Sequence, residues 1–64
     1  MKSKTTIEEL TELAYQRHKT EFGEWREGKP VKSWYDDDGN ICVEYESGRW
    51  WHYKDLDLPF PTFW

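Results

Sequence analysis

Cys42 and His52 are the residues whose chemistry first suggests a function, because a thiol and an imidazole can form a nucleophile–base pair or bind a metal ion. His18 is the other histidine of the chain. Two histidines without further ligands make a poor zinc site. Whether Cys42 and His52 can act together depends on the faces of the sheet that they occupy, so the elements that carry them must be placed first.

The acidic run Asp36 to Asn40, DDDGN, matches only the first positions of a calcium-binding EF-hand loop. Counted from the first aspartate, Ile41 occupies the glycine position and Ser47 replaces the bidentate glutamate. A solvated hairpin turn is the better interpretation. The chain also has no glycine-rich phosphate loop and no nucleophile elbow. The sequence therefore predicts no catalytic, cofactor-binding or metal-ligating residue, and a protein that is not an enzyme.

Residues 6–22 are predicted to form an amphipathic helix. Thr6 and Glu9 have the spacing of a capping box, and the same pattern begins one residue earlier at Thr5. Gly23 suits the C-cap. At about 100° per residue, one face of this helix is mostly apolar. That face holds Ile7, Leu10, Leu13, Ala14, Tyr15, His18 and Phe22.

After residue 30 the pattern changes to that of short strands joined by tight turns. Asp38-Gly39 and Ser47-Gly48 are both strong signals for two-residue hairpin loops. They separate three predicted strands, which form an antiparallel meander. These strands cover residues 31–36, 41–46 and 49–54.

Two-residue loops imply a register that sorts the strand residues onto two faces. Glu46 then pairs with Arg49 across the second hairpin. The face assigned to the helix holds Trp34, Ile41, Val43, Tyr45, Trp50 and His52. The other face holds Val31, Tyr35, Cys42, Trp51 and Tyr53, with Glu44, Glu46 and Arg49. A three-residue loop in the first hairpin would exchange Trp34 with Tyr35.

In this register Cys42 and His52 lie on opposite faces and cannot form a dyad. Cys42 is therefore interpreted as a small buried hydrophobic residue, and both histidines as core or edge residues. Trp25, in the connector after the helix, is expected to cover an edge of the core.

The tail, residues 55–64, is too apolar at Phe60, Phe63 and Trp64 to remain in water without a reason. Its prolines disfavour a helix. Two alternatives stay open: a lid folded over the second face of the sheet, or a docking peptide for another protein. The predicted fold is thus α+β, a single domain over residues 1–64 with a helix on a three-stranded meander and an extended tail across the sheet.

Composition limits the classes of binding partner and the cellular compartment that are expected. The 64 residues carry a net charge of −4, and residues 34–48 contain five acidic and no basic side chains. This charge opposes nucleic-acid binding. No stretch reaches the ~20 apolar residues of a membrane span. A single cysteine and an N-terminus without an apolar run indicate a cytoplasmic protein.

The sequence favours a small non-enzymatic protein-binding module, such as an accessory protein of a bacterium, phage or mobile element. One version is an acidic inhibitor that occupies a nucleic-acid site on its target. The candidate partner-binding residues are Tyr35, Trp51, Tyr53, Glu44, Glu46, Phe60, Phe63 and Trp64. The alternatives are a carbohydrate or small-ligand binder that uses an exposed aromatic sheet face, and a structural protein that self-associates. No cofactor is expected.

Overall fold

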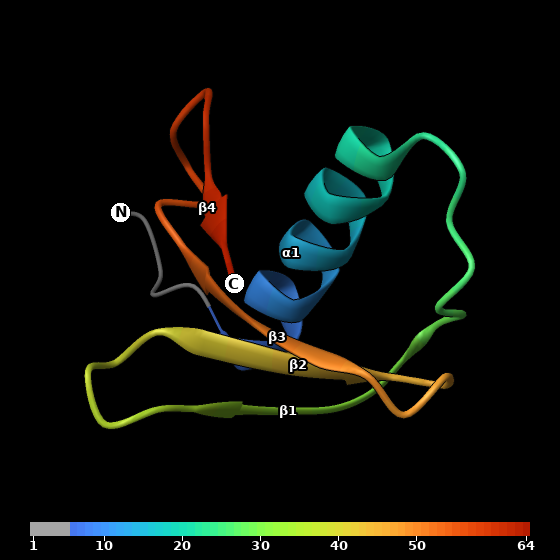
Figure 1. Ribbon diagram of the computed structural model, residues 1–64. Coiled ribbons are helices and arrows are strands. Elements are labelled where there is room, and N and C mark those ends of the chain that lie inside the picture. Colours follow the sequence, from blue (N-terminus) through green and yellow to red (C-terminus); the bar gives the residue numbers. More distant parts are fainter. Residues whose placement is uncertain (1–5) are drawn as a thin grey trace.

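The computed structural model describes residues 6–64, which form one helix and a four-stranded antiparallel sheet. Helix α1 lies across one face of the sheet, and no described helix or strand covers the opposite face (Figure 1). The strands are adjacent in the order β1-β2-β3-β4. The predicted α+β fold is confirmed. The elements are α1 (Ile7–Phe22), β1 (Pro30–Tyr35), β2 (Ile41–Tyr45), β3 (Trp50–Lys54) and β4 (Thr62–Phe63).

Both ends of α1 follow local rules and confirm the predicted boundaries. The Thr6 hydroxyl accepts from the Glu9 N–H at 3.2 Å, and the Thr6 N–H donates to the Glu9 carboxylate at 2.9 Å, which completes the capping box. The alternative cap, Thr5, lies outside the described residues. Gly23 has a φ of +80° and donates to the Lys19 carbonyl at 3.1 Å, so it ends the helix.

Both hairpin loops contain three residues, not two. In the first, the Gly39 N–H donates to the Asp36 carbonyl at 3.0 Å, and the Asp36 N–H donates to the Asn40 carbonyl at 2.9 Å. The second repeats this pattern with Gly48, Tyr45 and Arg49. Each loop is a type I turn followed by a glycine with positive φ, the usual geometry of a three-residue hairpin loop.

The extra residue in each loop shifts β1 and β3 by one position against β2. Cys42 pairs with His52 and Trp34, whereas Val43 pairs with Trp51. Because side chains alternate along a strand, this shift exchanges the faces of β1 and β3. The predicted faces of β1 and β3 are therefore wrong. Trp34, Trp50 and His52 point away from the helix, and Tyr35, Trp51 and Tyr53 point toward it.

The assignment of the central strand is confirmed. Ile41, Val43 and Tyr45 are buried and form the core with Ala14, Tyr53 and Leu56. His18 is also fully buried. Trp25 packs against this core as predicted, and its indole N–H donates to the Gly28 carbonyl at 2.6 Å. The helix and the aromatic side chains of β3 thus share one core.

The tail forms the fourth strand beside β3 instead of lying across a face. Phe63 pairs with Tyr53, and Trp64 exchanges two backbone hydrogen bonds with His52, at 2.9 and 3.2 Å. The lid alternative is wrong, because the helix already covers Trp51 and Tyr53. Arg17 on α1 holds the tail by donating to the carbonyls of Leu58 and Pro59, at 2.7 and 2.8 Å.

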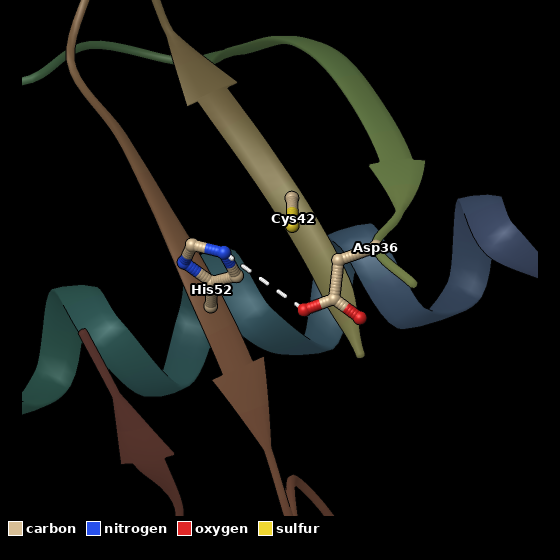
Figure 2. Close-up of side chains that lie close together, drawn as sticks. All are labelled: Asp36, Cys42 and His52. Atoms are coloured by element: carbon tan, nitrogen blue, oxygen red, sulfur yellow. Dashed lines mark ion pairs between the residues drawn. The ribbon is translucent and has the colours of Figure 1, made fainter. Parts of the chain in front are cut away.

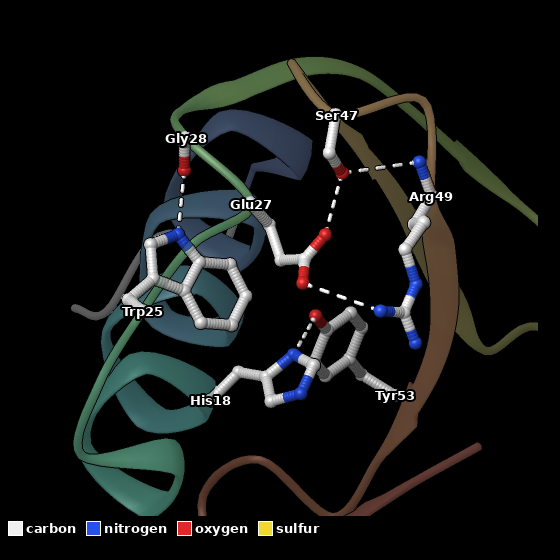
Figure 3. A network of polar contacts seen from close by, with 7 residues as sticks. All are labelled: His18, Trp25, Glu27, Gly28, Ser47, Arg49 and Tyr53. Atoms are coloured by element: carbon white, nitrogen blue, oxygen red, sulfur yellow. Dashed lines mark hydrogen bonds and ion pairs between the residues drawn. The ribbon is translucent and has the colours of Figure 1, made fainter.

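The connector between α1 and β1 is tied to the second hairpin by a buried carboxylate (Figure 3). Glu27 is 6% exposed and accepts from the Ser47 hydroxyl at 2.5 Å and from the Arg49 guanidinium at 3.4 Å. Next to it, Gly28 has a φ of +84°, and a Cβ there would lie 2.8 Å from Glu46 Cβ and in contact with Glu46 Oε1. The backbone approaches the hairpin too closely for any other residue.

We therefore expect Gly28→Ala to destabilise the fold more than Gly23→Ala. Both positions have positive φ, which strains an L-residue, but nothing lies within 4 Å of a Cβ built on Gly23. The clash with Glu46 should add about 1 kcal/mol or more to the free-energy loss of Gly28→Ala. Urea unfolding of both variants measures the difference. Equal losses would show that the hairpin accommodates the methyl group.

Candidate functional site

The corrected register brings together three side chains that the sequence prediction had separated. Cys42 and His52 are direct cross-strand partners, and Asp36 follows β1 on the same face (Figure 2). One ligand atom from each of the three lies within 4.8 Å of the others. His52 Nε2 is 3.8 Å from Asp36 Oδ2. The predicted separation of Cys42 and His52 is wrong because the second hairpin loop is longer by one residue.

Asp36 is oriented by the turn that it begins. Its Oδ1 accepts from the N–H groups of Asp38 and Asn40 at 2.9 and 2.8 Å, and its Oδ2 accepts from the Asn40 amide at 3.3 Å. Burial raises the pKa of this carboxyl, but the Asn40 and Asp38 hydrogen bonds and the nearby His52 outweigh it, so the pKa is lowered. Asp36 is therefore an ionised group whose free lone pairs face His52.

Cys42 lies beneath this pair and is fully buried. Burial, and secondly the Asp36 carboxylate, raise the pKa of the thiol. Because the thiolate is the nucleophilic form, a thiol with a raised pKa and no solvent exposure is poorly suited to covalent catalysis. The three residues thus lie close together but lack an activated nucleophile.

Four rings continue from this cluster across the open side of the sheet, and we call them the aromatic strip: Trp34, Trp50, His52 and Trp64. The ring centroids of Trp34 and Trp50 are 5.3 Å apart, and those of Trp50 and His52 are 5.0 Å apart. The Trp64 indole stacks on His52 at 4.8 Å with an interplanar angle of 3°. Neighbours on this open face are Lys32, Asp36, Cys42 and Glu44, and together these eight residues form the outer face.

The aromatic strip has a structural role as well as an exposed surface. It covers Cys42, which would otherwise be open on this side of β2. Trp50 is nevertheless 48% exposed and Trp64 51% exposed. The Lys32 ammonium lies 5.5 Å from the Trp34 ring centroid, within the range of a cation–π contact. The rings therefore form an apolar surface that water reaches and that can accept a cation.

The opposite face of the sheet holds a second polar cluster inside the core (Figure 3). His18 Nδ1 lies 2.6 Å from the Tyr53 hydroxyl, which lies 2.7 Å from the Tyr45 hydroxyl. His18 Nε2 has no hydrogen-bond partner among the described residues. Burial lowers the pKa of His18 to about 4 and raises that of Tyr45 to about 12. The prediction that His18 is a core residue is confirmed.

The predicted partner-binding residues are scattered over the molecule. Glu44 and Trp64 lie on the outer face. The assignment of Trp51 and Tyr53 to an open face is wrong, since Tyr53 is 1% exposed and Trp51 packs against the core. Phe63 also packs against the core.

The other three lie away from the outer face. Tyr35 is half-exposed beside a cavity of about 370 Å³ between α1 and the end of the sheet. Glu46 accepts from the Lys29 N–H at 2.9 Å, which gives it a structural contact. Phe60 is 87% exposed on the tail, so it remains a candidate for the docking-peptide alternative.

Sequence reasoning missed Trp34, Trp50 and His52 on the outer face. The signal was present in the first turn, because aspartate at the first position and glycine at the fourth are typical of a type I turn. Asp36 and Gly39 have that spacing. The same reading of Gly48 would have placed Cys42 beside His52.

Two further results bear on function. Within residues 6–64, helix α1 is too short and too polar to cross a membrane, and it is the sole helix of that part of the chain. Comparisons with protein-family models, with curated proteins and with solved structures found no match.

Proposed function

We propose that the protein is a small non-enzymatic binding module whose outer face docks onto another protein. The observation that carries this proposal is the aromatic strip, which lies on a sheet face that no described helix or strand covers. Exposed aromatic rings that cluster on one face are typical of binding surfaces. Trp50 and Trp64 are each about half-exposed, so they are the expected anchors.

Charge favours a basic partner. Asp36 and Glu44 share the outer face with Lys32, and Asp37 and Asp38 extend the acidic charge into the adjoining turn, so acidic groups outnumber basic ones there. Indole rings beside carboxylates suit arginine and lysine side chains, which can stack on the rings and pair with the acids. The partner we propose is therefore a protein surface that combines basic and apolar groups. A nucleic acid would be repelled by the same charge.

The proposed setting is the cytoplasm, as an accessory protein of a bacterium, phage or mobile element. A free buried thiol at Cys42 is compatible with a reducing compartment. One specific form of the proposal is an acidic inhibitor that covers the nucleic-acid site of its target. Binding of that kind weakens as the salt concentration rises, because opposite charges attract across the interface.

The aromatic strip also supports self-association, in which two outer faces meet. Sedimentation at several protein concentrations distinguishes self-association from docking onto another protein. A protein that is monomeric at every concentration does not self-associate. The aromatic sheet face that was predicted to bind carbohydrate is not exposed, because Trp51 and Tyr53 face the helix. Carbohydrate binding would have to use the indoles of the aromatic strip, and a glycan panel read by tryptophan fluorescence tests that alternative.

We expect peptides selected from a random display library against the protein to be rich in arginine or lysine and in apolar residues. Trp50→Ala should weaken their binding about tenfold or more, as loss of an anchor ring does. Phe60→Ala, at an equally apolar and more exposed position on the tail, is the control and should bind normally.

Fluorescence anisotropy of labelled peptides measures both variants, and urea unfolding verifies that Trp50→Ala remains folded. Peptides that bind Trp50→Ala as tightly as the natural chain would contradict the proposed surface. Loss of binding in Phe60→Ala alone would move the site to the tail.

A further inference from the structure

We propose that Asp36, Cys42 and His52 form a zinc-binding site on the outer face. Carboxylate, thiolate and imidazole are the three ligand types that zinc uses in proteins. Asp36 directly follows β1, Cys42 is the second residue of β2 and His52 is at the centre of β3, so the site joins three adjacent strands (Figure 2). This inference goes beyond protein binding and does not depend on it.

The distances are close to those of a zinc site. Zinc bonds of roughly 2.0–2.3 Å in a tetrahedron place ligand atoms about 3.3–3.6 Å apart. His52 Nε2 and Asp36 Oδ2 are 3.8 Å apart, and the ligand atoms of all three residues lie within 4.8 Å of one another. Small rotations of the His52 and Asp36 side chains toward Cys42 close the remaining gap. Both side chains retain some exposure, 26% and 19%, which leaves them room to turn.

Two contacts around the site orient the ligands as metal sites require. His52 Nδ1 lies 3.4 Å from the Trp64 carbonyl oxygen, to which only a protonated Nδ1 can donate. That tautomer leaves a lone pair on Nε2, the nitrogen that faces Asp36. Asp36 is held in turn by two backbone N–H groups on Oδ1. In zinc sites a carbonyl oxygen commonly accepts from the ligating histidine, and the ligating carboxylate is commonly hydrogen-bonded as well.

The charge balances on binding. Cys42 releases its thiol proton to solvent as the sulfur–zinc bond forms, so one thiolate and one carboxylate neutralise the two positive charges of the ion. A water molecule or a ligand from a partner would fill the fourth position of the tetrahedron, since the side chains of His52 and Asp36 remain partly exposed. A soft sulfur ligand favours zinc over magnesium and calcium, which prefer oxygen.

The test is titration of the full chain, stripped with a chelator and kept reduced, with zinc chloride by calorimetry and with cobalt chloride by absorbance. We expect one equivalent of each metal to bind. Cobalt should produce visible bands of a tetrahedral site and a near-ultraviolet band of sulfur-to-cobalt charge transfer. Magnesium and calcium should not compete. Cobalt binding without the sulfur band would overturn the site, because Cys42 is the single cysteine of the chain.

Variants identify the ligands. Cys42→Ala and His52→Gln should each weaken zinc binding at least tenfold, and Asp37→Asn, in the same turn but outside the cluster, should bind zinc like the natural chain. Unchanged zinc affinity in both ligand variants would refute the inference. Because Trp50 contributes no ligand, Trp50→Ala should bind zinc like the natural chain. If the natural chain binds zinc but selects no peptides, the proposed function is refuted and the zinc site is not.

Discussion

Val43→Asp should leave the protein unfolded at 25 °C. Val43 is fully buried at the centre of β2, with Trp51 opposite it and the helix above it. A buried carboxylate without a partner costs several kcal/mol. A domain of this size has a stability of only ~5 kcal/mol or less, so the substitution should exceed it. Far-ultraviolet circular dichroism and tryptophan fluorescence report the outcome.

Val31→Asp is the matched control for this prediction. Val31 also lies on a strand, but its side chain is 58% exposed, so a carboxylate there remains in water. Its effect should be within about 0.5 kcal/mol, as for most surface substitutions. A Val43→Asp variant that unfolds cooperatively in urea with native-like fluorescence would show that the core lies elsewhere.

Acid should destabilise the fold between pH 6.5 and about 4, because of His18. Its pKa is lowered from 6.5 to about 4, chiefly by burial, and the nearby Glu27 carboxylate and Arg49 guanidinium oppose each other. A group that is neutral in the fold but charged in the unfolded chain contributes full stability above its unfolded pKa. That contribution disappears as the pH falls toward its folded pKa. The difference corresponds to up to about 3 kcal/mol.

Urea unfolding at pH 7, 5.5 and 4 measures this loss. In His18→Gln the stability should vary less over that range, whatever its value at pH 7, because glutamine does not titrate. The Asp36 carboxyl, whose pKa is lowered from 3.8, loses its contribution only at more acid pH, so the two effects are separable. A flat profile in the natural chain would contradict the burial of an uncharged His18.

Local rules explain why much of the fold is predictable. The capping box at Thr6, the glycine after Phe22 and the turn glycines act over three or four residues, so their effect is visible in the sequence. Strand boundaries deviate by at most one residue from those expected. Ile41 and Val43 were assigned to the core from their branched aliphatic side chains, and they are buried there.

The candidate site was not predictable in the same way, because it depends on one residue in each loop. A loop of two residues and a loop of three both contain Asp-Gly or Ser-Gly, but they place opposite faces of β1 and β3 against the helix. Trp50 and Trp51 are chemically alike, so hydrophobicity alone cannot decide which of them points inward. The predicted separation of Cys42 from His52 followed directly from the wrong choice.

By itself, the sequence determined the helix, the three strands of the meander and the central core residues, since these follow from capping, turn and period-two patterns within short segments. The tertiary structure decided which aromatic side chains are buried. His18 lies among Phe22, Trp25, Trp51, Tyr53 and Phe63. That packing requires Trp51 and Tyr53 on the inner side, and pleating then places Trp50 and His52 outside, beside Cys42 and Asp36. Pairing of residues distant in sequence, not any local preference, therefore created the outer face.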